Sequence, residues 1–324
     1  MKRVLSGIQP SGSLHVGNYF GMMNRMIKYQ DENELFSCIV NYHALTTSND
    51  PEVLRENTIN ATLDFFALGL DPEKSTFWIQ GDVPHVTEFT WIISNVTNVG
   101  LIERSTSYKD KISKGVIPNM GLFSYPLLMA SDILCFGSEI VPVGKDQKQH
   151  LEIARDIAVR FNNIYGDILV IPEEDIDKDT QLVPGTDGQK MSKSYNNIIP
   201  IFGDESFIKQ QIMSIVTDST PVDQPKDLNS PLYRLFTLFL SDKDKKILEN
   251  KFLSPGLQYG KVKADLCDTA IEYFRPFRDK RDYLSKNLDY VFNQLAIGSE
   301  KATLVADQII DKVRTVTGLN YSTK

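Results

Sequence analysis

Five short apolar runs in the first 203 residues restrict the folds that this chain can adopt. Each run has the length and composition of a buried β-strand, and they lie at residues 4–8, 35–40, 75–79, 139–143 and 167–171. Helical patterns separate several of them, and Asp50-Pro51 supplies a helix cap followed by proline at the first helical position. Strands alternating with helices through short turns predict an α/β fold with a parallel sheet.

A change of pattern after residue 203 divides the chain. Residues from about 205 to 324 show helical periodicity and no further strand signal, whereas about 85–120 forms a helical insertion within the first part. We expect a sheet-containing domain at 1–203 and an all-helical domain at 204–324, whose last helix packs back on the first domain.

Composition excludes several classes of protein. The chain has 324 residues and a net charge of −7, so nucleic-acid contact must come from local patches. Its 3 cysteines are widely spaced, which argues against a zinc site or a disulfide framework. No secretory signal is visible, and the most apolar window (121–137) contains Asp132, which favours a buried helix over a membrane span. We therefore expect a cytoplasmic protein that does not contact membranes.

The segment from Gly185 to Ser194 carries two lysines and two hydroxyls after a pair of glycines. Lys190 and Lys193 alternate with Ser192 and Ser194. A flexible loop with two cations suits an anion whose charge grows during a reaction, above all a triphosphate. The alternative is an ordinary solvated basic loop.

A second candidate site lies where the first strand meets a helix. There the chain reads Gln9-Pro10-Ser11-Gly12 and, shortly after, His15-Val16-Gly17-Asn18. Ligands of open α/β sheets bind at the carboxyl ends of strands, and a helix N-terminus favours phosphate. Spacing excludes a dinucleotide fingerprint or a Walker loop. A lone histidine after a turn is more often an ordinary capping residue.

The two segments together resemble the class I aminoacyl-tRNA synthetases. Residues 15–18 are similar to the HIGH motif of that class, and residues 190–194 read KMSKS letter for letter. The order and separation of the motifs also match, and the resemblance extends over essentially the whole chain. It implies a Rossmann-like nucleotide-binding domain followed by a helical domain.

The segment Tyr125-Pro-Leu-Leu-Met129-Ala-Ser-Asp132 bears on the amino acid. A thioether at Met129 suits packing on an aromatic ring, and a carboxylate at Asp132 can accept the indole N–H. Tyrosine enzymes of the archaeal type have glutamine at the place of Met129. With Gly144-Lys145-Asp146-Gln147, the segment looks like the bacterial tryptophan-specific branch. Tyrosine remains the harder competitor, since its hydroxyl could also donate to Asp132.

The resemblance implies that ATP and L-tryptophan give tryptophanyl-adenylate, and that tryptophan then passes to tRNA(Trp). The catalytic candidates are His15, Asn18, Lys190, Ser192, Lys193 and Ser194. The candidates for ATP binding are Gln9, Pro10, Ser11, Gly17, Asn18, Gly144, Lys145, Asp146, Val183, Lys190, Met191, Ser192, Lys193 and Ser194. Tryptophan-binding candidates are Leu5, His43, Tyr125, Met129, Asp132 and Gln147. Mg²⁺ is expected to arrive with the triphosphate and to use few protein ligands.

Two positions depart from the family pattern, and partners follow from the resemblance. Asn18 is a variant in the fourth HIGH position, and Lys145 stands where many relatives have an acidic residue. The helical part would bind the anticodon, for which Arg275, Arg278, Lys280 and Arg281 with interleaved Phe274, Phe277 and Tyr283 are candidates, although a solvated helical face fits them as well. The resemblance also implies a homodimer, whose interface lies near the insertion after the third strand.

Three other functions stay open. They are a tyrosine-specific synthetase, a synthetase-like tRNA-binding or regulatory protein without aminoacylation, and a small-molecule adenylyltransferase, which would lack a large helical domain.

Overall fold

The structure is a computed structural model that describes residues 1–10, 12–47, 49–113, 115–144, 147–175 and 182–321. The chain forms two compact units. The first comprises Met1–Gly12, Met26–Lys178 and Asn287–Lys324, and the second comprises Ser13–Arg25 and Asp179–Lys286. Within the described ranges, no helix is both long and apolar enough to cross a membrane.

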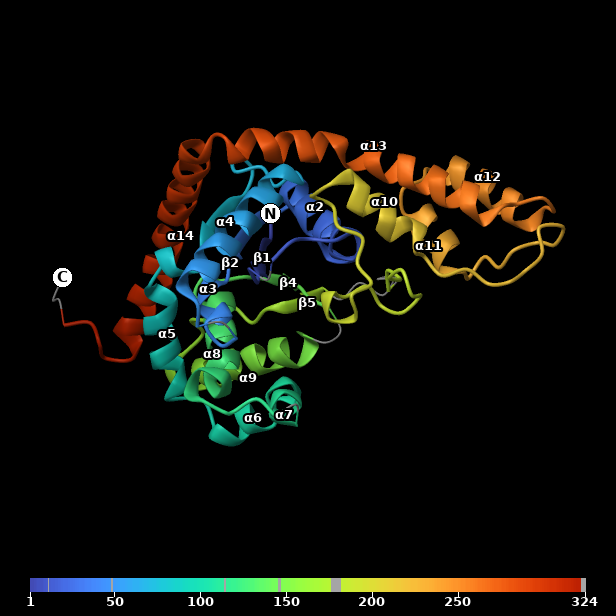
Figure 1. Ribbon diagram of the computed structural model, residues 1–324. Coiled ribbons are helices and arrows are strands. Elements are labelled where there is room, and N and C mark those ends of the chain that lie inside the picture. The colour runs from blue at the N-terminus through green and yellow to red at the C-terminus, as the bar shows by residue number, and fades with distance from the viewer. Residues whose placement is uncertain (11, 48, 114, 145–146, 176–181, 322–324) are drawn as a thin grey trace. The chain divides into compact units, whose positions relative to one another are not determined.

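The first unit is built on a parallel sheet (Figure 1). Its strands are β1 (Arg3–Ile8), β2 (Glu34–Ile39), β3 (Thr76–Ile79), β4 (Ile140–Pro142) and β5 (Glu173–Asp175), in the spatial order β3-β2-β1-β4-β5. All pairs are parallel, and β1 runs in register with β2 from Arg3↔Glu34 to Ile8↔Ile39. The predicted α/β class is confirmed.

The last strand lies a few residues beyond its predicted position. The apolar run at 167–171 is not a strand, because the Asn162 side chain forms hydrogen bonds with its backbone. The backbone N–H groups of Ile168 and Leu169 donate to Asn162 Oδ1, and Asn162 Nδ2 donates to the Leu169 carbonyl. Pairing with β4 begins only at Glu173, after Pro172. The apolar run therefore marked a buried connection and not the strand itself.

Helices cover both faces of the sheet (Figure 1). Most of α2 (Asn24–Glu32) and α4 (Pro51–Ala67) lie on one face, and α8 (Met120–Leu134) and α9 (Lys148–Tyr165) lie on the other. Asp50 caps α4 as predicted, since its carboxylate accepts from two backbone N–H groups. Shorter elements are α3 (Asn41–Ala44), the 3₁₀ turn η2 (Gln80–Asp82), α5 (His85–Ser94), α6 (Val99–Glu103) and α7 (Thr106–Ser113).

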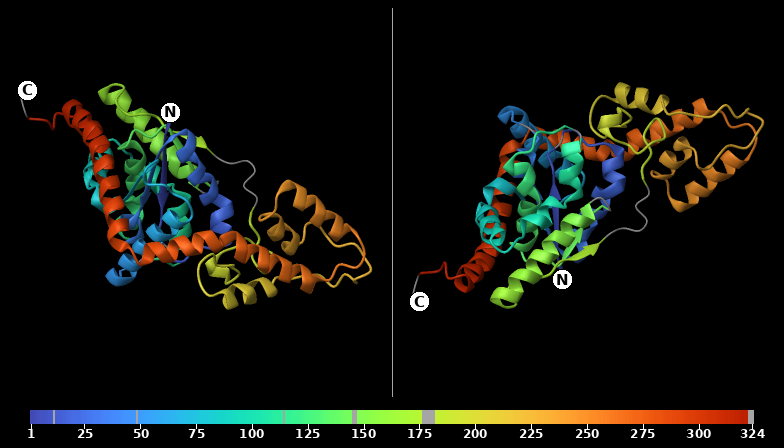
Figure 2. Two further views of the ribbon diagram at one scale, coloured as in Figure 1. Left: turned by 90° about the horizontal axis from the view of Figure 1, so that it is seen from above. Right: turned by 90° about the horizontal axis from the view of Figure 1, so that it is seen from below.

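The last helix, α14 (Leu288–Val316), belongs to the first unit and packs along β3 (Figure 2). Gly298 makes this approach possible, because a Cβ there would lie 1.9 Å from the Phe77 carbonyl oxygen. Ala302 and Ala306 continue the same small-residue face into the core.

The second unit contains α1 (Val16–Asn18), the π-helical segment η1 (Tyr19–Met23), the 3₁₀ turn η4 (Lys193–Tyr195), α10 (Glu205–Met213), α11 (Pro231–Thr237), α12 (Asp242–Leu253) and α13 (Tyr259–Ser285). Its α10 packs on α13. An aromatic cluster of Tyr19, Phe20, Phe239, Tyr273, Phe274 and Phe277 joins η1 to α13.

This cluster corrects one prediction about nucleic-acid contact. Phe274 is buried among the other rings, so it cannot stack on a base. Arg278 is also mostly buried and forms an ion pair with Glu205. Tyr283 remains exposed on the same helix.

Candidate active site

The sheet order locates a ligand edge in the first unit. Because β1 and β4 are neighbours and the chain runs outward from them in opposite directions, the sheet has a switch point between their carboxyl ends. Gln9 and Pro10 directly follow β1, and one residue separates Gly144 from the end of β4. Gln9 is exposed and Pro10 is buried. The other predicted nucleotide residues of this edge, Ser11, Lys145 and Asp146, lie outside the described residues.

A buried carboxylate lies in the same unit. Asp132 on α8 is 4% exposed and accepts hydrogen bonds from two side chains. Gln80 Nε2 lies 2.8 Å from each carboxylate oxygen, and His43 Nε2 lies 3.0 Å from Oδ2. Burial and the Asp132 charge raise the pKa of the Cys38 thiol, so that thiol stays neutral beside the carboxylate. The Asp132 carboxylate is therefore buried and accepts hydrogen bonds from the neighbouring Gln80 and His43 side chains.

Among the other predicted tryptophan-binding residues, Tyr125 lies beside His43, and Met129 precedes Asp132 by three residues on α8. The Tyr125 ring lies edge-on to His43 at 6.2 Å between centroids, and its hydroxyl is 2.9 Å from His150 Nε2. Leu5 is buried in the core against which Met129 packs. Gln147 precedes α9, and its backbone N–H donates to the Gly144 carbonyl at 2.9 Å. The structure thus brings His43, Tyr125 and Asp132 together directly.

His15 and Asn18 in the second unit hold one another. The Asn18 N–H donates to His15 Nδ1 at 3.3 Å, and the His15 N–H donates to Asn18 Oδ1 at 3.1 Å. This capping box satisfies two backbone donors at the start of a helix. Because Nδ1 is an acceptor, the neutral ring carries its hydrogen on Nε2.

Charge and burial keep the His15 ring neutral. Burial lowers the pKa of His15 to about 4, and the nearby Lys193 charge acts in the same direction. His15 can therefore donate a hydrogen bond near neutral pH without adding a positive charge to the two lysines.

The lysine segment packs directly beside this helix start. Gly17 donates its N–H to the Met191 sulfur at 3.2 Å, and a Cβ at Gly17 would lie 3.0 Å from both Met191 Cβ and His15 Nδ1. The Val16 N–H also donates to the Ile199 carbonyl at 2.9 Å. Glycine at this position is required for contact between the two motifs.

Asn197 organises the lysine segment. Its buried amide accepts from the Ser192 N–H at 2.8 Å and donates to Asp187 at 2.7 Å and to the Lys190 carbonyl at 3.1 Å. The side chains of Lys190 and Lys193 remain exposed, and the Ser192 and Ser194 hydroxyls lie 2.8 Å apart. Val183 is buried, and its carbonyl accepts from the Met191 N–H.

The two glycines of this segment serve different purposes. Gly188 has φ = 85°, a left-handed conformation that glycine adopts without strain. Gly185 does not have positive φ; instead, a Cβ there would lie 2.3 Å from the Asn197 side chain. The absence of a side chain at Gly185 therefore makes room for Asn197.

Three polar residues of these sites were missed from the sequence. Gln80 follows β3 directly, so the rule that ligands bind at strand carboxyl ends could have identified it. No such signal marks His150 or Asn197. The partner of His150, Tyr125, is distant in sequence, and the contacts of Asn197 form only when the loop is folded.

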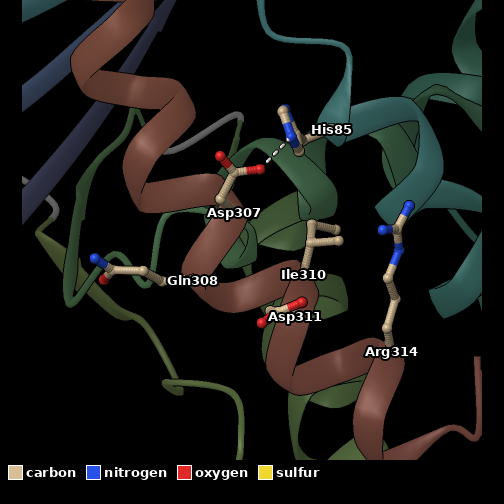
Figure 3. A pocket seen from close by; sticks show the side chains of 6 residues that line it. All are labelled: His85, Asp307, Gln308, Ile310, Asp311 and Arg314. Carbon is tan, nitrogen blue, oxygen red and sulfur yellow. Dashed lines mark hydrogen bonds and ion pairs between the residues drawn. The ribbon is translucent and has the colours of Figure 1, made fainter. Parts of the chain in front are cut away.

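A separate cavity of about 360 Å³ lies between α5 and α14 (Figure 3). It is lined by His85, Asp307, Gln308, Ile310, Asp311 and Arg314. The His85–Asp307 contact is 2.8 Å, and Arg314 pairs with Glu88 at 2.6 Å. None of the predicted site residues lines this cavity. Among the described residues, no three histidine, cysteine or acidic side chains are grouped to hold a metal.

Known proteins resemble this chain over nearly its full length. The family described as tRNA synthetases class I (W and Y) matches residues 1–275. Tryptophan–tRNA ligases of Fusobacterium nucleatum and Rhodopirellula baltica are 51% and 48% identical, covering 98% of this chain and 98% and 99% of theirs. The crystal structure of tryptophanyl-tRNA synthetase from Campylobacter jejuni, complexed with ADP and tryptophan, is 46% identical with a TM-score of 0.93, covering 98% of this chain and all of that one. The chain therefore belongs to the class I tRNA synthetases of the tryptophan and tyrosine group.

Proposed function

We propose that this chain is a tryptophan–tRNA ligase, which activates L-tryptophan with ATP and transfers it to tRNA(Trp). The observation that carries this proposal is identity of up to 51% to tryptophan–tRNA ligases over 98% of the chain. The choice of tryptophan over tyrosine rests on the identity to tryptophan–tRNA ligases and on Met129, where tyrosine enzymes of the archaeal type have glutamine; Asp132 supplies a buried acceptor for the indole N–H. The intact lysine segment argues against a binding protein without catalysis, since such a protein needs no cationic loop.

Tryptophan binds in the first unit. The indole N–H, which can only donate, bonds to Asp132, and the ring packs against Met129 and Leu5. His43 and Tyr125 form the wall beside the carboxylate, supported by their edge-on ring contact. Gln147 and Tyr125 are the candidates for the substrate ammonium group.

In the first unit, the candidates for ATP contact are Gln9, Pro10 and Gly144, beside the switch point of the sheet. In the second unit, the candidates are Gly17, Asn18, Val183 and the lysine segment. The tryptophan carboxylate attacks the α-phosphate, and pyrophosphate leaves. No protein nucleophile is needed, so catalysis consists of positioning and charge stabilisation.

Lys190 and Lys193 hold the departing pyrophosphate, with hydrogen bonds from Ser192 and Ser194. The neutral His15 donates through Nε2 near the phosphates, which is supported by the depressed pKa of its ring. A magnesium ion would arrive with the triphosphate and would supply further neutralisation of phosphate charge.

The region 204–324 binds the tRNA anticodon, through basic residues of α13 such as Arg275, Lys280 and Arg281. Tyr283 is the exposed aromatic residue there. The enzyme acts as a homodimer in the cytoplasm, with its interface at the helical insertion.

Amino-acid-dependent ATP–pyrophosphate exchange tests the proposal. We expect exchange with tryptophan and not with tyrosine or phenylalanine in the absence of tRNA. Exchange with tyrosine would overturn the assignment of the substrate, and no exchange with any of the three would favour a binding protein.

The Lys193→Ala variant tests the role of the lysine segment. We expect kcat to fall by about 10²–10³-fold with little change in KM for tryptophan, because the charge acts on the leaving group. Lys243→Ala, at an exposed position on α12, is the matched control. An unchanged kcat in Lys193→Ala would contradict the assignment.

A further inference from the structure

Asp132 is buried without a full counter-charge. Its donors are the Gln80 amide and the His43 ring, and within the described residues no lysine or arginine lies within ion-pair distance of it. A buried carboxylate is costly unless donors satisfy it, and its orientation follows theirs. The neutral amide of Gln80, which reaches both oxygens, is thus the contact that fixes the plane of the carboxylate.

Gln80 is itself held firmly. Its side chain is 0% exposed, and its Oε1 accepts from the Tyr42 N–H at 3.0 Å. This second bond settles the orientation of the amide, because reversal would place an NH₂ against an N–H and an oxygen against a carboxylate. Gln80 therefore connects the turn after β3 with α3 on one side and with α8 on the other.

We infer that Gln80 is a positioning residue for substrate selection: it fixes Asp132 so that one lone pair remains aimed at the substrate ring. A carboxylate has about four acceptor positions, and two donors, the Gln80 amide and the His43 ring, already bond to it. Acceptor capacity remains for a further donor. The donor-only indole N–H of tryptophan matches it, whereas phenylalanine leaves it empty. This inference rests on the proposed contact between Asp132 and the indole.

The ordinary alternative is that Gln80 only ties neighbouring segments together. A bond of that kind exists close by, since Asn41 Oδ1 accepts from the Gly81 N–H at 2.9 Å without contacting Asp132. Asn41→Ser is therefore a matched control: it weakens the same turn and leaves the donors of Asp132 in place.

The decisive comparison uses tryptophan and its benzothienyl analogue, in which sulfur replaces the indole N–H. ATP–pyrophosphate exchange is measured for each in the wild type, Gln80→Met and Asn41→Ser. The quantity compared is the kcat/KM for tryptophan divided by the kcat/KM for the analogue. This ratio isolates the N–H contact, because general damage to the pocket affects both substrates alike. We expect Gln80→Met to raise KM for tryptophan by about 10-fold and to reduce the ratio by about 10-fold, with kcat little changed. Asn41→Ser should keep the wild-type ratio.

The outcomes separate the inference from the proposed function. A wild-type ratio near one would overturn the Asp132–indole contact itself. A large wild-type ratio that persists in folded Gln80→Met would overturn the role of Gln80 alone. Should Gln80→Met fail to fold, Gln80→Leu removes the donor with a smaller apolar side chain; retention of the ratio in that variant would equally overturn the inference.

Discussion

The amide of Asn197 shows how one side chain can set the shape of a functional loop. It bonds to the backbone on both sides of Met191 and to Asp187, and it occupies the space above Gly185. The side chains of Lys190 and Lys193 remain exposed on the same loop. The loop therefore owes its shape to a residue outside the KMSKS motif.

Replacing Asn197 with aspartate should disturb the loop while keeping its size. The Ser192 N–H keeps an acceptor, but both donor bonds are lost and a second carboxylate faces Asp187. We expect kcat for pyrophosphate exchange to fall by about 10–100-fold, as for the loss of one or two buried hydrogen bonds. Asn196→Gly, which keeps the left-handed backbone at φ = 52°, is the control. Equal kinetics in the two variants would exclude this role for Asn197.

The depressed pKa of His15 predicts a dependence of stability on pH. The pKa is about 4 in the folded chain and ordinarily 6.5. Between these values the unfolded state binds a proton that the folded state does not, so the free energy of unfolding falls as the pH is lowered from 6.5 to 4. His15→Asn keeps a capping acceptor but cannot titrate. The difference in unfolding free energy between wild type and variant should therefore shrink by about 1–3 kcal/mol over that range, measured by denaturant titration. A pH-independent difference would refute the assignment.

At the scale of elements, the close contact of α14 with β3 depends on Gly298. An added methyl group would meet the Phe77 carbonyl at 1.9 Å, and backbone on both sides leaves little room to yield. We expect Gly298→Ala to destabilise the protein by about 3 kcal/mol or more. Gly260→Ala on α13 meets nothing within 4 Å and should be neutral or slightly stabilising. Equal melting temperatures for the two variants would contradict the predicted clash.

Elements with a strong pattern could be predicted from sequence, and those fixed by a distant side chain could not. The apolar runs located β1 to β4, and Asp50-Pro51 located the start of α4. The position of β5 was not predicted, because the Asn162 side chain on α9 forms hydrogen bonds with the backbone of the segment that precedes β5. Likewise, the motifs identified His15 and Lys193. The place of Gln80 directly after β3 could have marked it as a candidate, but its contact with Asp132 spans 52 residues, and the contacts of Asn197 form only in the folded loop, so neither set of contacts could be predicted. Burial of Phe274 depends on η1, which is far away in the sequence.

At the scale of the whole molecule, several large apolar side chains of the helical insertion are exposed to solvent. Trp91 on α5 is 73% exposed, Val99 on α6 is 62% exposed, and Ile117 before α8 is 85% exposed. Large exposed apolar side chains concentrated in one region are typical of a protein interface, where aromatic residues contribute strongly. The exposed side chains of the insertion are consistent with an interface there, and Trp91, the aromatic one among those three, is the residue to test.

Replacing Trp91 with glutamate should convert the dimer into a monomer at micromolar concentration, because a charge would be buried in the interface without a partner. Light scattering coupled to size-exclusion chromatography measures the mass directly, against 36.7 kDa for one chain. Ile247→Glu, at an exposed apolar position on α12, is the control and should leave the mass unchanged. A folded Trp91→Glu variant that stays dimeric would place the interface elsewhere, whereas a wild-type monomer would refute the homodimer itself.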